Sequence, residues 1–119
     1  MKRKTSLTLI SQAKERFEEL LNAALQQERS GKTNTPEMQL LKSISQKSEF
    51  LKGHHAAGKH IPNRFIPAGL GVSNLFKVNL CGYNRMIYTL HTKEEEIGIF
   101  VLFIISHPEY DKIFGYKKK

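Results

Sequence analysis

The sequence predicts an α+β protein in which an N-terminal helix hairpin packs on a small antiparallel sheet and a short C-terminal helix follows. In the first half of the chain, apolar residues recur at the three- and four-residue spacing of a helix face. In the second half they alternate with polar residues, as in strands that bury one face. A length of 119 residues is that of one domain, so we expect a single domain over residues 1–119.

Two helices are expected before residue 54, and their end signals are readable. The first begins at Ser11, whose hydroxyl is the expected cap, and it stops at Ser30-Gly31. The second opens with Thr35-Pro36-Glu37, which combines a cap, a first-turn proline and an early acid, and it ends at Gly53. The short polar connection between them predicts an antiparallel hairpin. Before the helices, Leu7–Ile10 favours a short opening strand.

Three strands and a last helix are expected after a long loop. Residues 53–69 are rich in glycine and proline and show neither helical nor strand periodicity. Residues 72–80 and 85–90 alternate, whereas Ile97–Ile105 is apolar on both faces, as in a central strand covered on each side. The turns between these strands are short, which predicts antiparallel pairing. Pro108 suits the first turn of a short helix that Gly115 ends.

Composition narrows the functional classes. The apolar run Ile97–Ile105 is far shorter than the roughly 20 residues of a membrane helix, and Leu7–Ile10 is too short for a signal peptide. The single cysteine, Cys81, excludes an internal disulfide and suits a reducing cytoplasm. The sequence contains neither the phosphate-binding loop Gly-x-x-x-x-Gly-Lys-Ser/Thr nor the dinucleotide-binding motif Gly-x-Gly-x-x-Gly. His54, His55 and His60 have no cysteine or carboxylate nearby in sequence, so no metal or cofactor is expected.

The net charge of +8 makes nucleic acid the first partner to consider. The charge is unevenly placed, because no Asp or Glu occurs between Phe50 and Lys93. That window holds Lys52, Lys59, Arg64, Lys77, Arg85, Lys93 and four of the five histidines. We interpret it as one surface for an anionic ligand; the alternative is a basic surface that only keeps the protein soluble.

Histidine, lysine and arginine are sufficient side chains for cleaving RNA without a metal. The reaction needs a base for the 2′-hydroxyl proton, an acid for the leaving 5′-oxygen, and cations for the charge on the phosphate. Histidine can take either proton role near neutral pH, and lysine or arginine can hold phosphate.

The segment Ile104-Ile105-Ser106-His107-Pro108-Glu109-Tyr110-Asp111-Lys112-Ile113 resembles the closing motif of HigB toxins, in the RelE/ParE superfamily of toxin–antitoxin systems. In that motif a buried strand runs into Thr-His-x-Glu-Tyr-Asp-x-Ile, so Ser106 replaces a threonine. The segment Tyr83-Asn84-Arg85-Met86-Ile87-Tyr88 is similar to the family's arginine-bearing strand. The resemblance covers residues 70–114 and implies a RelE-like fold.

The resemblance also implies roles for individual residues. His107 would transfer a proton, or else only cap the last helix. Tyr110 would stack on a base, assist the proton or anchor the helix; Asp111 would orient a histidine or the 2′-hydroxyl, or be a surface charge. One of His54, His55 and His60 would meet His107 across an open cleft, and sequence does not choose among them. The expected phosphate-binding residues are Lys59, Arg64, Arg85 and Lys112.

The function so implied is that of a type II toxin, an mRNA endonuclease that works on the ribosome and arrests translation. Its partners would be a cognate acidic antitoxin and mRNA, with no membrane and no cofactor. The alternative is a non-catalytic basic module, either a ParE-like gyrase inhibitor or a nucleic-acid-binding protein.

Overall fold

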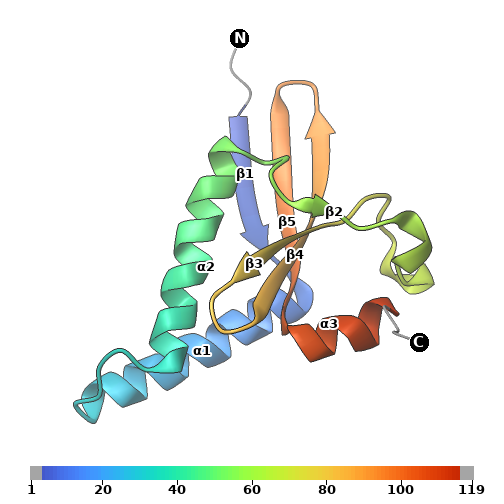
Figure 1. The fold of residues 1–119 in the computed structure, drawn as a ribbon. Coiled ribbons are helices and arrows are strands. Elements are labelled where there is room, and N and C mark those ends of the chain that lie inside the picture. The colour runs from blue at the N-terminus through green and yellow to red at the C-terminus, as the bar shows by residue number, and fades with distance from the viewer. Residues whose placement is uncertain (1–3, 116–119) are drawn as a thin grey trace.

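A five-stranded sheet is the centre of the computed structural model, which describes residues 4–115. In chain order the elements are β1 (Lys4–Leu9), α1 (Ser11–Arg29), α2 (Pro36–Gly53), β2 (Lys59–His60), 3₁₀ turns at Asn63–Phe65 and Ala68–Leu70, β3 (Phe76–Leu80), β4 (Asn84–Lys93), β5 (Glu96–Ser106) and α3 (His107–Phe114). The strand order is β1-β5-β4-β3-β2 (Figure 1). The α+β class is therefore confirmed.

The sheet is mixed, which corrects the prediction of an antiparallel one. β2, β3, β4 and β5 pair antiparallel, as the short turns indicated, but β1 lies parallel to β5. Helices α1 and α2 and three strands separate β1 from β5 along the chain. No tight turn joins the two strands, so no turn length in the sequence could reveal their relative direction.

The junction of β1 and α1 differs from the expected capped start. Ser11 is the first helical residue, with a φ of +51°, and Ile10 is the cap residue, without a side-chain capping bond. The Ile10 N–H donates to the Val101 carbonyl at 2.9 Å, so strand pairing continues up to the helix. Gln12 then fixes the helix against β5, because its side chain donates to the Ile104 carbonyl and accepts from the Ile104 N–H.

The other expected helix ends are confirmed. The Thr35 hydroxyl accepts from the Met38 N–H at the start of α2, with Pro36 in the first turn. Ser30 ends α1, and Gly115 ends α3 with a φ of +69°. Ser106 and Glu109 form a reciprocal capping box at the start of α3. Ser106, and not His107, is therefore the cap of the last helix.

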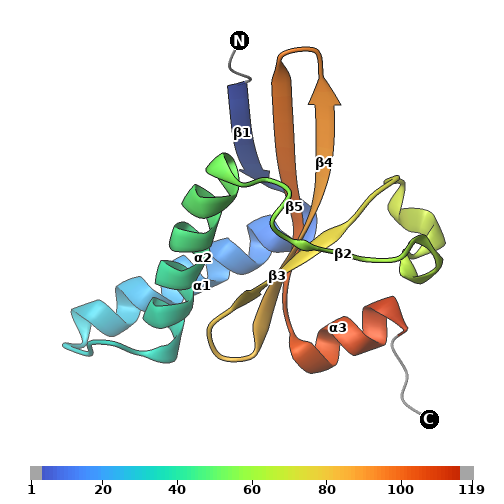
Figure 2. The ribbon, with the colours of Figure 1, turned by 45° about the horizontal axis from the view of Figure 1, so that its top comes forward.

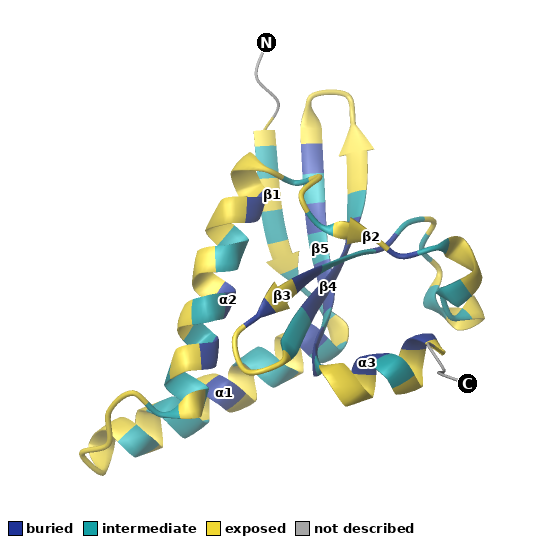
Figure 3. Ribbon diagram, in the orientation of Figure 1, coloured by how far each residue is buried: buried dark blue, intermediate teal, exposed yellow. Residues whose placement is uncertain are grey.

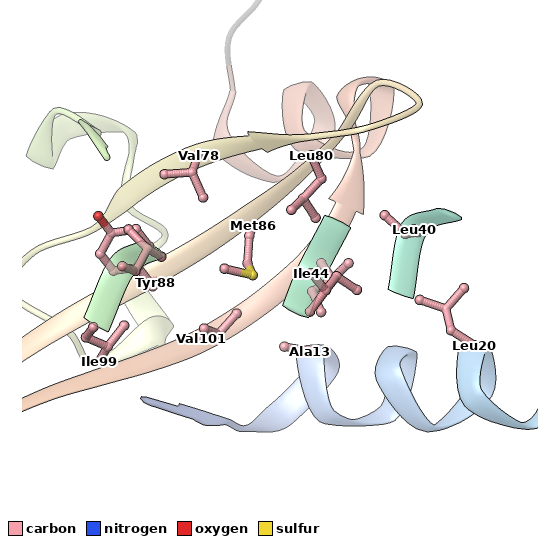
Figure 4. Close-up of a cluster of buried hydrophobic side chains, with 12 residues drawn as sticks. Ala13, Leu20, Leu40, Ile44, Val78, Leu80, Met86, Tyr88, Ile99 and Val101 are labelled. Carbon is pink, nitrogen blue, oxygen red and sulfur yellow. The ribbon is translucent and has the colours of Figure 1, made fainter. Parts of the chain in front are cut away.

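Both faces of the sheet are covered, as the apolar run of β5 predicted (Figures 2 and 3). Helices α1 and α2 cover one face; Ala13, Leu20 and Ile44 from these helices pack against strand residues that include Met86 and Val101 (Figure 4). On the other face, α3 and the segment after β2 cover a second cluster. Its buried members are Ile61, Leu75, Ile87, Leu102, Ile105, Tyr110 and Phe114. Phe103 is half-buried against this second cluster.

A bulge in the pairing of β4 and β5 changes which residues face each cluster. Ile87 pairs with Phe103 but Tyr88 pairs with Val101, so Leu102 is an extra residue. As a result Leu102 and Phe103, neighbours in sequence, both contact the second cluster. After the bulge, Ile105 faces the same side as Ile87, and the strand delivers α3 to that side.

The glycine-rich segment is more ordered than the expected loop. It contributes β2 at the sheet edge and the two 3₁₀ turns. The buried Tyr88 anchors its start, because the Tyr88 hydroxyl donates to the His55 carbonyl at 2.9 Å and accepts from the Gly58 N–H at 3.0 Å.

No helix within residues 4–115 combines the length and the apolar character that crossing a bilayer requires.

We predict that Tyr88→Phe lowers the free energy of unfolding by about 1–3 kcal/mol, since it leaves two backbone groups of the 55–58 segment without their partner. Urea unfolding measures the change. Tyr83→Phe is the matched control, because the Tyr83 side chain is 87% exposed and its stability should match the wild type. A Tyr88→Phe protein as stable as the wild type would show that this anchor contributes nothing.

Candidate active site

Strand alternation places several cations on the sheet face opposite α1 and α2. Lys77 and Arg85 follow this pattern, since their neighbours Val78 and Met86 belong to the cluster under the helices. Lys59 pairs with Lys77 across β2 and β3, and Arg85 pairs with Asn79 across β3 and β4. Three basic residues from three adjacent strands thus share one face.

Tyr110 of α3 lies against two of these cations. The Lys77 ammonium lies 4.6 Å and the Arg85 guanidinium 4.8 Å from the centre of its ring. The ring is fully buried and stacks on Phe114 at 4.8 Å. Cation–π attraction of this kind stabilises a desolvated cation by about 2 kcal/mol or more. Tyr110 therefore anchors α3 and holds the cations; in this structure it is not accessible for stacking on a base.

The environment of Lys77 lowers the pKa of its ammonium group below 10.5. Partial burial is the largest cause, and the positive charges of Arg85 and Lys59 add to it. The carboxylate of Asp111 acts in the opposite direction. The Lys77 ammonium is thus partly desolvated and lies beside two like charges.

His107 is the first residue of α3 and follows β5 directly, as predicted for the strand end. Its Nε2 lies 3.5 Å from Oδ2 of Asp111, one turn later on the same helix. Both side chains are about half exposed, so the pair reaches solvent. The Asp111 carboxylate therefore lies beside the His107 imidazole on the same face of α3.

A pocket of about 560 Å³ opens between the β3–β4 turn and the start of α3. Its lining residues are Asn79, Leu80, Gly82, Tyr83, Asn84, Arg85 and His107. The turn and the helix are joined, because the His107 N–H donates to the Tyr83 carbonyl at 2.9 Å. One hollow is thus lined by His107 and by Arg85, the arginine that lies against the Tyr110 ring.

The expected meeting of a loop histidine with His107 is not found. The exposed His54 stacks on Phe50 of α2 at 4.5 Å. His55 offers its carbonyl to Tyr88, and His60 lies edge-on to Phe76, which packs on the helix side of the sheet. In both ribbon views α2 ends beside the upper part of β1, whereas α3 begins below the sheet, where β5 ends (Figures 1 and 2). Strand alternation explains His60: Lys59 faces the cation side, so its neighbour faces away.

Two further predicted phosphate-binding residues are placed outside the pocket. Arg64 lies in the first 3₁₀ turn with its guanidinium 4.7 Å from the Phe65 ring centre. Lys112 is exposed in the last turn of α3. Neither residue lines the pocket, whereas Arg85 does. Lys59 is the cross-strand partner of Lys77.

Sequence reasoning named no site role for Asn79 and Tyr83, and it included Lys77 in the acid-free window without assigning it a role of its own. Alternation with Val78 and Leu80 could have placed Lys77 and Asn79 on the face of Arg85. Tyr83 could have been identified only as an unusual residue of a hairpin turn.

Comparison of the chain with protein-family models, curated proteins and solved structures finds no match. Among residues 4–115, no group of three or more His, Cys, Asp or Glu side chains is arranged to hold a metal ion. The basis for a functional proposal is therefore the site itself.

We predict that Arg85→Gln raises the pKa of Lys77 towards 10.5, because it removes a neighbouring positive charge, and that Asp111→Asn lowers it. Titration of the lysine side-chain NMR signals measures both shifts. Lys52→Gln is the control, since it removes an exposed charge at the end of α2 and should leave the Lys77 pKa unchanged.

The lowered pKa of Lys77 also makes the stability of the fold depend on pH. A lysine with a lowered pKa binds fewer protons in the folded than in the unfolded state, so stability should rise with pH between the folded pKa and 10.5. Lys77→Met should flatten this rise. A pKa of Lys77 that does not respond to Arg85→Gln would contradict the described electrostatics.

Proposed function

We propose that this protein is an endoribonuclease that needs no metal, and that it acts as the toxin of a type II toxin–antitoxin system with a RelE-like fold. The observation that carries the proposal is a single open pocket lined by His107 and Arg85, with Asp111 beside His107 on α3 and Lys77 beside Arg85 against the Tyr110 ring. These groups supply both the proton-transfer and the phosphate-binding chemistry that RNA cleavage requires.

The proposed reaction divides the work among these groups. The 2′-oxygen attacks the adjacent phosphorus while its proton passes to the Lys77 amine. The bond from phosphorus to the 5′-oxygen breaks, and the imidazolium of His107 gives a proton to the leaving oxygen. Arg85 stabilises the charge that grows on the phosphate oxygens, and the Asp111 carboxylate lies 3.5 Å from Nε2 of His107, where it positions the ring. The products are a 2′,3′-cyclic phosphate and a 5′-hydroxyl.

The partners proposed for this activity follow from charge. The chain has a net charge of +8 and would bind mRNA on the ribosome, in the cytoplasm. An acidic antitoxin that covers the pocket would inhibit this binding.

One observation supports a second function, that of a non-catalytic module that binds gyrase or nucleic acid. Only one histidine lines the pocket, because His54, His55 and His60 are placed elsewhere. A non-catalytic module that binds gyrase or nucleic acid needs cations but no second histidine. Cleavage with Lys77 as the base needs no second histidine either, and the placement of His107 and Arg85 in one pocket, with Asp111 beside His107, favours the nuclease.

We predict that His107→Ala lowers RNA cleavage by about 10²- to 10⁴-fold, the usual contribution of a general acid. Asp111→Asn should give a smaller loss, because the histidine keeps its position but loses its charged partner. Mapping of transcript ends after induction measures cleavage in cells. His60→Ala is the control and should cleave like the wild type, since His60 faces the opposite side of the sheet. Growth arrest by both the wild type and His107→Ala, without transcript cleavage in either, would favour the gyrase-binding alternative.

We predict a steep fall of RNA affinity with salt, since each phosphate bound by a cation releases counterions. Joint replacement of Lys59, Lys77 and Arg85 by glutamine should reduce the slope of log K against log salt by about 2, at about 0.7 for each phosphate that is no longer neutralised. Joint replacement of Lys14, Lys32 and Lys42 changes the net charge equally but at exposed positions of the helical layer, so it should keep the slope. Equal slopes for the two triple variants would show that the cationic face is not the binding surface.

A further inference from the structure

We propose that Tyr83 is a nucleobase-stacking residue, and that its ring holds an unpaired RNA base beside the phosphate that is cleaved. The inference rests on the proposed RNA-cleaving function and adds to it a positioning residue. Three independent observations at the β3–β4 turn lead to it.

The first observation is the exposure of the ring. Tyr83 is 87% exposed, whereas Tyr88 and Tyr110 are both fully buried. Within residues 4–115, Tyr83 is thus the tyrosine whose ring contributes almost nothing to the core. Unpaired RNA bases stack on exposed aromatic rings of this kind.

The second observation is the backbone conformation of the same residue. Gly82 and Tyr83 have φ values of +66° and +61°, and the Asn84 N–H donates to the Cys81 carbonyl. Positive φ at both central positions defines a turn that normally uses Asn and Gly. A tyrosine there is strained, since its Cβ lies close to the following carbonyl oxygen. The Asn84 side chain donates to the carbonyls of Cys81 and Gly82 and maintains the turn. A strained residue that adds no packing is typical of a functional position.

The third observation is the place of the turn in the site. The Tyr83 carbonyl accepts the N–H of His107 at 2.9 Å, so the turn and the proposed acid are fixed to one another. Tyr83, Arg85 and His107 all line the same pocket. Its volume, about 560 Å³, is within the roughly 300–1,000 Å³ of small-ligand sites. A base on the ring would therefore lie next to the groups that bind the phosphate and move the proton.

Stacking is tolerant of base identity, because every base has an aromatic face. Tyr83 should accordingly contribute affinity and positioning for all four bases. This distinguishes it from Lys59, Lys77 and Arg85, whose contribution depends on phosphates and on salt.

The test compares two non-cleavable 2′-O-methyl oligonucleotides, one with all its bases and one with abasic positions. Tyr83→Asn removes the ring but suits the positive φ, so it preserves the turn. It should lose about 10- to 100-fold in affinity for the complete oligonucleotide and little for the abasic one. Tyr83→Phe should bind like the wild type.

A second measurement uses the absence of tryptophan from the sequence. Tyr83→Trp provides one fluorophore, whose emission the complete oligonucleotide should quench and the abasic one should not. Leu25→Trp is the matched control, at a 43%-exposed position of α1 outside the pocket, and should not be quenched.

The outcomes separate the two proposals. If Tyr83→Asn has the wild-type affinity for both oligonucleotides, or loses the same affinity for both, the stacking role alone is overturned. A wild-type protein that binds neither oligonucleotide overturns the RNA-cleaving function and the stacking role together.

Discussion

Burial of β5 on both faces is the constraint on which the rest of this structure depends. Its residues Ile99 and Val101 pack under the helix hairpin, whereas Leu102 and Ile105 pack under α3 and the segment after β2. A strand that is apolar on both faces requires two covering layers. The second layer leaves the pocket open beside the β3–β4 turn. The candidate site therefore lies at the edge of that second layer.

The same layer explains how like charges can lie close together. Lys77 and Arg85 are on adjacent strands and repel one another, which contributes to the lowered pKa of Lys77. The electron-rich face of Tyr110 offsets part of this repulsion, and the anchoring of that ring by Phe114 keeps it in place. A phosphate bound between these cations would relieve the remaining repulsion.

The turn at Gly82-Tyr83 connects this cationic face to His107. A single backbone hydrogen bond joins the Tyr83 carbonyl to the first residue of α3, and the capping box of Ser106 and Glu109 fixes the start of that helix. These hydrogen bonds fix the position of the His107 backbone. The pair of His107 and Asp111 needs only the spacing of one helical turn.

The sequence by itself determined the α+β class, the two helices of the hairpin, the antiparallel β3–β4–β5 meander and the place of His107 at the end of β5. Each of these depends on local signals: the apolar period, Thr35 and Pro36 at a helix start, or a short turn between strands. The His107–Asp111 pair was also within reach of sequence, since residues four apart share a helix face. Tertiary structure alone decided the parallel pairing of β1, because no turn joins it to β5. It also decided the bulge at Leu102, since an apolar run shows no alternation from which a shift could be read. The burial of Tyr110 under two cations and the separation of His54, His55 and His60 from His107 followed from packing between distant segments, which no local pattern of residues encodes.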